Sequence, residues 1–318
     1  MKQKHKPDFL IVGMQRSGTH WVSAMLNAHP EVACFPALPF RSENPEHDMK
    51  RIGEVHLFNT LASLEPEVDK SLTRPLENFL TQVHGIFADL VPLRDRLPRQ
   101  ELYEKFLERY EELCEQIRGN KRLVGENTPL YVFHLDFIDR VYPNIKKICV
   151  LRDPKDVAVS WHFNLIRKGR KSSAEPISDG FVEEYCRGTL VPELQSLLDY
   201  KGEVHCLTYE ALHQHPEKVV KDLLDFLQVK SEDVVIRNMI HEASFERLTE
   251  VDSGGRSRRP GEQSITSHYR KGIVGDWKNN LTEKQAKIVD ELTSKLTDQV
   301  MEKYKVNRFR SVAQPGTP

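Results

Sequence analysis

Short apolar runs alternate along the chain with segments in which apolar residues recur every three or four positions. Buried strands are predicted at residues 9–12, 146–151 and 204–208. Amphipathic helices are predicted at residues 21–26, 100–118 and 219–227. This order of elements favours an α/β fold, a three-layer α/β/α domain with a central parallel sheet.

Length and composition indicate one domain over residues 1–318, because 318 residues with 39% hydrophobic content can bury a large core. Residues 36–97 hold several prolines and few clear periods, and we interpret them as an insertion that shapes an acceptor pocket. The helix at 100–118 carries an aromatic stripe that is more typical of core than of a substrate site. Residues 308–318 are predicted to be a flexible tail.

The segment Gly13-Met-Gln-Arg-Ser-Gly-Thr-His20 lies between the first strand and the first helix. A glycine-containing turn that opens a helix directs backbone N–H groups and the helix dipole at a phosphate. A nucleotide triphosphatase would have Lys and then Ser or Thr after the second glycine. Here Thr19 and His20 follow Gly18, and the cation, Arg16, lies inside the turn. The segment therefore predicts a phosphate site without a metal.

A second candidate phosphate site is Arg152-Asp-Pro-Lys-Asp-Val-Ala-Val-Ser160, which follows the strand at 146–151. Open α/β sheets bind ligands at the carboxyl ends of their strands. Pro154 suits the first turn of a helix and Asp153 its amino-terminal cap. We expect Arg152 and Ser160 to lie two turns apart on one helix face and to bracket a phosphate.

The third candidate is Tyr269-Arg-Lys-Gly-Ile-Val-Gly-Asp-Trp-Lys-Asn-Asn-Leu-Thr282. Its Arg270, Lys271 and Gly272 offer two cations and a close backbone approach, which suits a phosphate monoester. Thr282 and Gln285 predict a capping box for a carboxyl-terminal helix. The basic segment 253–261 just before it is predicted to be a flexible loop, either able to close over a ligand or idle in solvent.

Together these three segments resemble those of 3′-phosphoadenosine 5′-phosphosulfate (PAPS)-dependent sulfotransferases, which have a P-loop-like fold. Gln15-Arg-Ser-Gly-Thr-His-Trp21 is similar to the family's Pro-Lys-Ser-Gly-Thr-Thr-Trp loop. Arg152 to Ser160 match its Arg-x-Pro-x-Asp-x-x-x-Ser pattern, and Arg270 to Thr282 its Arg-Lys-Gly-x-x-Gly-Asp-Trp-Lys-Asn-x-Phe-Thr signature, with Leu281 at the Phe position. The resemblance implies transfer of a sulfuryl group from PAPS, with adenosine 3′,5′-bisphosphate (PAP) as product.

The resemblance also implies the roles of individual residues. The 5′-phosphosulfate would be held by Arg16, Ser17, Gly18, Thr19 and His20. The 3′-phosphate would be held by Arg152, Ser160, Arg270, Lys271 and Gly272. Trp21 would stack on the adenine, and Tyr209 and Phe245 would line the nucleotide. Arg16 would also stabilise charge on the leaving phosphate.

The reaction requires a general base, for which three residues are candidates. Glu54, in Gly53-Glu-Val-His-Leu-Phe58, resembles the catalytic Glu in the Lys-Glu-Val-His-Phe-Phe run of heparan sulfate 3-O-sulfotransferase-like enzymes. His56 would lie on the same side of an extended segment, and imidazole titrates near neutral pH. Glu126, in Glu-Asn-Thr-Pro-Leu-Tyr131, resembles the Glu-Lys-Ser/Thr-Pro-x-Tyr segment of carbohydrate sulfotransferases, although Asn127 replaces the Lys. Base, substrate-positioning and purely structural roles stay open for Glu126.

Composition narrows the partners. The formal net charge of −1 gives no reason to expect nucleic acid or an anionic membrane, so we expect a small-molecule or carbohydrate acceptor with a hydroxyl or amine. The five cysteines show no metal or redox spacing and are predicted to be core residues of a cytoplasmic protein. Two alternatives remain. A P-loop small-molecule kinase would need metal ligands and the missing Lys, whereas a noncatalytic adenosine-phosphate binding module would need no base.

Overall fold

The computed structural model describes residues 6–35, 54–63, 87, 90, 93 and 96–306. Most of the predicted acceptor-pocket insertion at 36–97 and the whole of the predicted tail at 308–318 lie outside the described residues.

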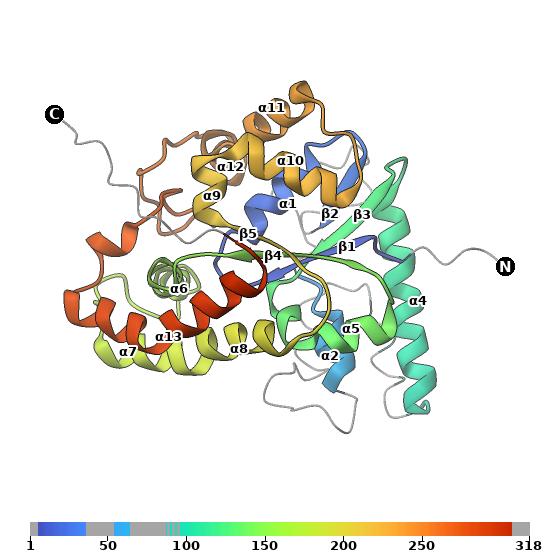
Figure 1. Cartoon of the computed structure of the whole chain (residues 1–318), viewed down its shortest axis with the longest axis horizontal. Coiled ribbons are helices and arrows are strands. Elements are labelled where there is room, and N and C mark those ends of the chain that lie inside the picture. The colour runs from blue at the N-terminus through green and yellow to red at the C-terminus, as the bar shows by residue number, and fades with distance from the viewer. Residues whose placement is uncertain are drawn as a thin grey trace.

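A parallel sheet of five strands forms the centre of the molecule (Figure 1). The strands are β1 (Phe9–Gly13), β2 (Val32–Phe35), β3 (Leu123–Asn127), β4 (Lys146–Leu151) and β5 (His205–Thr208). Their order is β2-β3-β1-β4-β5, and every neighbouring pair is parallel. The chain passes from β1 to the β2 edge, returns through β3, which lies between them, and then crosses to β4 on the other side of β1. The turn after β1 therefore lies where the strand order reverses, which is where such sheets bind ligands.

Alternate side chains of the strands enter two separate cores, as the two-residue period of a strand requires. In β1, Phe9 and Ile11 pack into the first core and Leu10 and Val12 into the second. The first core is covered by α1 (Thr19–Asn27), α9 (Tyr209–Gln214), α10 (Pro216–Leu227) and α11 (Asp233–Glu242). The second is covered by α2 (Leu57–Ser63), α4 (Arg99–Arg118), α5 (Leu135–Val141), α6 (Pro154–Arg167), α7 (Asp179–Tyr185), α8 (Val191–Asp199) and α13 (Glu283–Lys303). The predicted α/β architecture is confirmed, with helices above and below the sheet (Figure 1).

Several local predictions are also confirmed. The apolar stripe of α4 is core: Phe106, Tyr110 and Leu113 are buried. Thr282 and Gln285 form a capping box at the start of α13. All five cysteines are free, and four of them are buried. Within the described ranges, the helices lack the length and hydropathy of a membrane span.

Candidate functional site

The turn after β1 depends on its two glycines. Gly13 has φ +135°, and a Cβ there would lie 2.5 Å from the carbonyl oxygen of Val150 on β4. Gly18 has φ +106°, and a Cβ there would come within 2.7 Å of the Tyr209 ring. Gly18 is also the N-cap of α1 and gives no side-chain cap. The first N–H groups of α1 have no acceptor inside the helix, so they are available to an anion.

Arg16 lies within this turn in a left-handed backbone conformation, with φ 69°. Its Nε donates to Ser160 Oγ at 3.3 Å, and its NH2 donates to the His268 carbonyl at 3.4 Å. Burial, and then the charge of Arg167, lower the pKa of Arg16 to about 10, so it remains a cation at neutral pH. Its neighbour Ser17 has a buried hydroxyl without a partner among the described residues.

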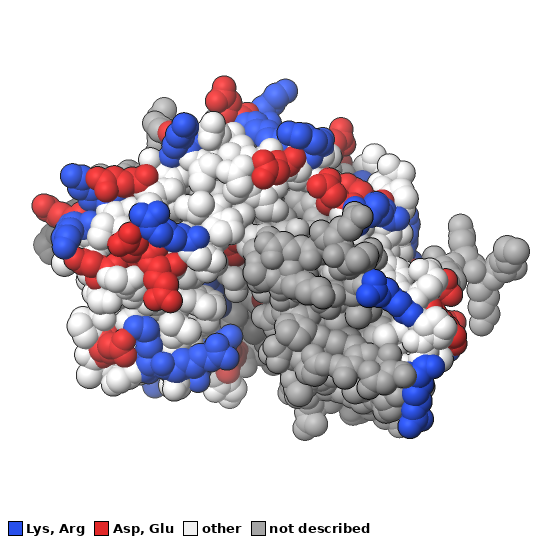
Figure 2. Space-filling view, turned by 90° about the horizontal axis from the view of Figure 1, so that it is seen from below, with Lys and Arg blue, Asp and Glu red and all other residues white. Residues whose placement is uncertain are grey.

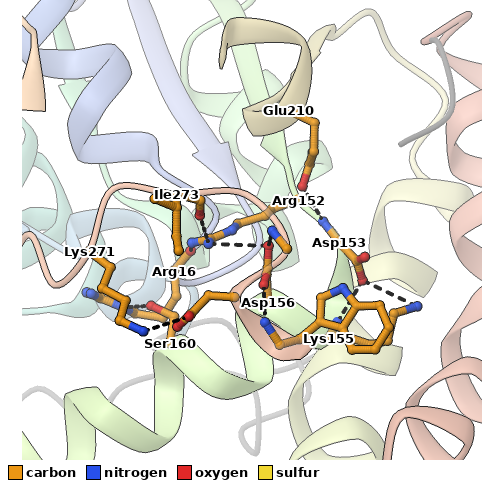
Figure 3. A network of polar contacts seen from close by, with 12 residues as sticks. Arg16, Arg152, Asp153, Lys155, Asp156, Ser160, Glu210, Lys271 and Ile273 are labelled. Atoms are coloured by element: carbon orange, nitrogen blue, oxygen red, sulfur yellow. Dashed lines mark hydrogen bonds and ion pairs between the residues drawn. The ribbon is translucent and has the colours of Figure 1, made fainter. Parts of the chain in front are cut away.

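Arg152 connects the turn to the carboxyl ends of β4 and β5 (Figure 3). Its guanidinium donates to the carbonyl oxygens of Arg16, at 3.4 Å, and Ile273, at 3.2 Å. The guanidinium carbon lies 4.2 Å from the centre of the Tyr209 ring. Arg152 Nε is buried without a partner in the described part of the chain. Three predicted cofactor residues thus meet at one point.

One expectation about this region was wrong in its geometry. Arg152 does not lie on a helix with Ser160, because α6 begins at Pro154. Asp153 caps the amino terminus of α6 as predicted, with its side chain accepting from Lys155 N at 2.9 Å. Ser160 is reached through Arg16, which lies between it and Arg152 (Figure 3). The turn after β1 therefore links the two residues that were expected to lie two turns apart on one helix face.

The carboxyl-terminal motif is fastened to α6 by a buried carboxylate. Asp156, 1% exposed, accepts from Gly275 N at 2.7 Å and from Trp277 N at 2.9 Å. Lys271 donates to Asp276 at 2.8 Å, and Arg270 pairs with the same carboxylate. The two predicted phosphate-binding cations are thus held by an acid that sequence reasoning did not assign. The Asp-Trp pair of the motif was the available signal.

Three aromatic side chains lie near the predicted nucleotide site: Trp21, Tyr209 and Phe245. Trp21 lies 5.4 Å from Tyr209, with the rings edge to face, and its Nε1 donates to the Ala243 carbonyl at 2.8 Å. Gly272 has φ +63°, and a Cβ there would come within 2.2 Å of the Phe245 ring. The helix α12 (Phe245–Asp252) therefore begins against the predicted 3′-phosphate segment.

Glu54 lies between two histidines. His20 Nε2, from the start of α1, is 3.3 Å from Glu54 Oε1, and His56 Nε2 is 3.2 Å from Oε2. Burial opposes ionisation, but the hydrogen bonds from both imidazoles outweigh it and hold the pKa of Glu54 well below its usual value. The segment is not extended as expected, because His56 has φ 55° and α2 begins at the next residue. This turn brings His56 back to Glu54.

Glu126, at the end of β3, is fully buried. Its carboxylate accepts from the hydroxyls of Tyr110 at 2.5 Å, Thr128 at 2.7 Å and Tyr131 at 2.9 Å. Burial raises the pKa of Glu126 to about 7, although these hydrogen bonds favour the ionised form. Its partners belong to α4 and to the turn after β3, so the carboxylate joins the edge of the sheet to the covering helix.

Sequence reasoning missed three residues of this site. The rings of His268 and His20 lie edge to face, with their centres 4.6 Å apart. Burial, together with the nearby His20 and Arg16, holds the pKa of His268 well below its usual value. Arg167, at the end of α6, lies in the same pocket as Arg16 and His268. Arg258 donates to the Arg270 carbonyl at 2.8 Å and so ties the basic loop to the motif. Only Arg258 had a signal, because it lies in the basic loop.

Comparison with known proteins identifies the family. The sulfotransferase domain model matches residues 6–305. A flavonol 3-sulfotransferase of Flaveria bidentis is 34% identical over 167 residues, or 47% of this chain and 54% of that protein. Sulfotransferase 1B1 of the dog is 31% identical over 198 residues, or 57% and 64% of the two chains. This chain thus spans about half to two thirds of the length of these curated relatives.

Solved structures agree on the fold. Mouse sulfotransferase SULT7A1, in complex with PAP, superposes with a TM-score of 0.55 at 18% identity, covering 94% of this chain and 88% of that chain. A sulfotransferase from Alicyclobacillus acidocaldarius superposes with a TM-score of 0.53 at 17% identity, covering 95% and 97%. The protein has the P-loop-like sulfotransferase fold, and the chain belongs to the sulfotransferase family.

Within the described residues, no group of three or more His, Cys, Asp or Glu side chains is arranged to hold a metal ion. Acidic and basic side chains are mixed over the described part of the face in Figure 2. Because the described part of this face has no large patch of one charge, the positive charge available to an anion comes from four local side chains: Arg16, Arg152, Arg270 and Lys271.

Proposed function

We propose that the protein transfers the sulfuryl group of PAPS to a hydroxyl or amine of a small-molecule or carbohydrate acceptor. The single observation that carries the proposal is the meeting of Arg16, Arg152 and Tyr209 after three different strands. Cations beside unsatisfied helix N–H groups and an aromatic ring suit a nucleotide with two anionic ends.

The residues present fit such a donor. Arg16, Ser17 and the first N–H groups of α1 would hold the 5′-phosphosulfate, where the buried Ser17 hydroxyl has no partner among the described residues. Arg152, Ser160, Arg270, Lys271 and Gly272 would hold the 3′-phosphate. Trp21, Tyr209 and Phe245 would line the adenosine, and Gly18 and Gly272 leave no Cβ to displace those rings. Thr19 and His20 complete the first turn of α1.

The transfer needs one proton acceptor. The acceptor oxygen forms a bond to sulfur, the sulfur–oxygen bond to the 5′-phosphate breaks, and its electron pair stays on that phosphate. Arg16 stabilises this charge. We assign the proton to Glu54, which is ionised at neutral pH and accepts the proton as the attacking hydroxyl becomes acidic. His20 and His56 hold its carboxylate, and His56 is the second candidate for the base.

Glu126 is the weaker candidate. Its carboxylate already accepts from three hydroxyls and has no exposed surface. We propose that it organises the end of β3 instead.

The test is calorimetry with PAP, followed by assays with labelled PAPS. We expect PAP to bind without Mg²⁺ and Arg270→Ala to weaken binding roughly tenfold to a hundredfold, because a charged hydrogen bond contributes about 1.5–3 kcal/mol. Arg16→Ala should lower kcat about 10²- to 10³-fold, as the loss of a transition-state donor does. Arg187→Ala, which removes an exposed charge paired with Glu183, is the control.

Two results would contradict the proposal. Preference for ATP with Mg²⁺ over PAP would indicate a kinase. Tight PAP binding with no transfer to any acceptor, and no change on replacing Glu54, His56 or Glu126 singly, would indicate a noncatalytic adenosine-phosphate binding module.

A further inference from the structure

A pocket lies between α6 and the segment 264–270. It is lined by Arg16, Ser160, Phe163, Asn164, Arg167, Ser264, Ile265, Ser267, His268 and Arg270. Phe163 and Ile265 give it an apolar wall, and Ile265 is 38% exposed. Three arginines give it a positive wall. A positive wall beside an apolar wall suits a charged substituent carried on an apolar body.

The donor site does not account for all of this positive charge. Arg16 and Arg270 belong to the proposed donor site, but Arg167 does not. Arg167 follows Ser160 by seven residues on α6, or about 10 Å along the helix axis at 1.5 Å per residue. Its NH2 donates to Asn164 Oδ1 at 2.9 Å, and its buried Nε has no partner in the described part of the chain. Lys168 follows at the end of the helix.

Arg167 lies near Glu54 through two intervening imidazole rings. It lines the pocket together with His268, whose ring centre is 4.6 Å from that of His20. His20 Nε2 is in turn 3.3 Å from Glu54 Oε1. The Glu54 carboxylate is among the charges that act on Lys168, on Arg16 and on His268. The charge of Arg167 acts on the same three groups. The pKa of Lys168 is lowered mainly by burial and next by Arg167. Within the described ranges, neither Arg167 nor Lys168 forms an ion pair with a carboxylate. Positive charge that has no ion-pair partner among the described residues thus lies near the proposed base.

We propose that Arg167 and Lys168 bind an anionic group of the acceptor, so that the protein selects acceptors with a carboxylate, phosphate ester or sulfate ester near the attacked hydroxyl. This inference rests on the proposed sulfuryl transfer and specifies its substrate class. An arginine fork pairs with two oxygens of such a group, and a lysine adds a point charge. Phe163 and Ile265 would contact the apolar body of the acceptor.

The experiment compares acceptors that differ only in charge. The pairs are 4-hydroxybenzoate with 4-hydroxybenzamide, and N-acetylglucosamine 6-sulfate with N-acetylglucosamine. For the wild type, we expect kcat/KM to be at least about tenfold higher for the anionic member of one pair, as a charged hydrogen bond provides. Which pair responds distinguishes a carboxylate from a sulfate ester.

Variants locate the effect. Arg167→Gln should reduce the anionic preference about tenfold or more and Lys168→Gln by less, while kcat/KM for the neutral member changes little. Arg187→Gln removes one charge outside the pocket and should leave the ratio unchanged. The affinity for PAP, measured by calorimetry, should be unchanged in all three variants.

Three outcomes would overturn the inference. The first is no anionic preference in the wild type, and the second is no turnover of either anionic compound although PAP binds. The third is an equal loss for both members of a pair in Arg167→Gln, since Arg167 would then serve the sulfuryl group of the donor. Failure of the wild type to bind PAP would instead refute the proposed function.

Discussion

The two glutamates that the sequence offered as candidate bases, Glu54 and Glu126, are in opposite environments. Glu54 has a side chain that is 28% exposed and two imidazole partners, whereas Glu126 is fully buried among hydroxyl groups. The histidines hold the pKa of Glu54 well below its usual value, and burial raises that of Glu126 to about 7. A glutamate therefore suits proton transfer at position 54 and stabilisation of the fold at position 126, because its hydrogen-bond partners and its exposure to solvent set its ionisation.

The strongest test of this contrast is Glu54→Gln. We expect kcat to fall by about 10²- to 10⁴-fold, which is the usual contribution of general base catalysis. PAP affinity should not change, because the substitution keeps the size of the side chain. The measurement is steady-state transfer from labelled PAPS, with calorimetry of PAP on the same preparation.

His56→Gln separates the two candidates on that side. If Glu54 is the base, His56→Gln should cost less than Glu54→Gln, because His20 still holds the carboxylate. A larger loss in His56→Gln would assign the base to the imidazole. A full loss in Glu126→Gln with Glu54→Gln active would reverse the contrast.

The second test uses the pH dependence of stability. Glu126 binds its proton more tightly in the folded protein, with a pKa of about 7 against an ordinary 4.5. The folded state then holds more protons between these values, so stability should fall as pH rises from about 5 to 7 and level off above. The total is on the order of 3 kcal/mol, at 1.36 kcal/mol per pKa unit.

Denaturant unfolding at several pH values measures this slope. Glu126→Gln should remove most of it, since an amide does not titrate. The matched variant Glu54→Gln should retain it. An unchanged slope in Glu126→Gln would mean that burial does not perturb this carboxyl.

The smallest expected effect is that of Tyr110→Phe. It removes the hydroxyl that donates to Glu126 at 2.5 Å but keeps the ring in the core. Unfolding free energy should fall by about 1.5–3 kcal/mol at most, as for a hydrogen bond to a charged group, with transfer activity kept. The comparison variant is Tyr103→Phe, which removes a hydroxyl from the same helix at a tyrosine that is only partly buried. Loss of activity with stability kept would place Glu126 in the reaction.

Local chemistry explains which features were predictable. The strand–turn–helix around Gly18, the cap at Asp153 and the capping box at Thr282 each depend on neighbours within a few residues. The geometry between Arg152 and Ser160 was mispredicted, because a residue from another strand end, Arg16, lies between them. The turn at His56 was missed for a similar reason. A left-handed backbone at a non-glycine residue has no signal in hydrophobic periodicity.

The sequence by itself determined the parallel α/β fold, the three segments that we propose bind anions and the residues available to each of them. Periodicity and short-range capping encode those features, since they need no knowledge of distant contacts. Only the tertiary structure decided that Asp276 holds Arg270 and Lys271, that Arg167 adjoins Arg16, and that the two glutamates differ. The physical reason is that pKa, burial and charge pairing depend on which groups lie within a few ångströms, and folding brings those groups from distant parts of the chain.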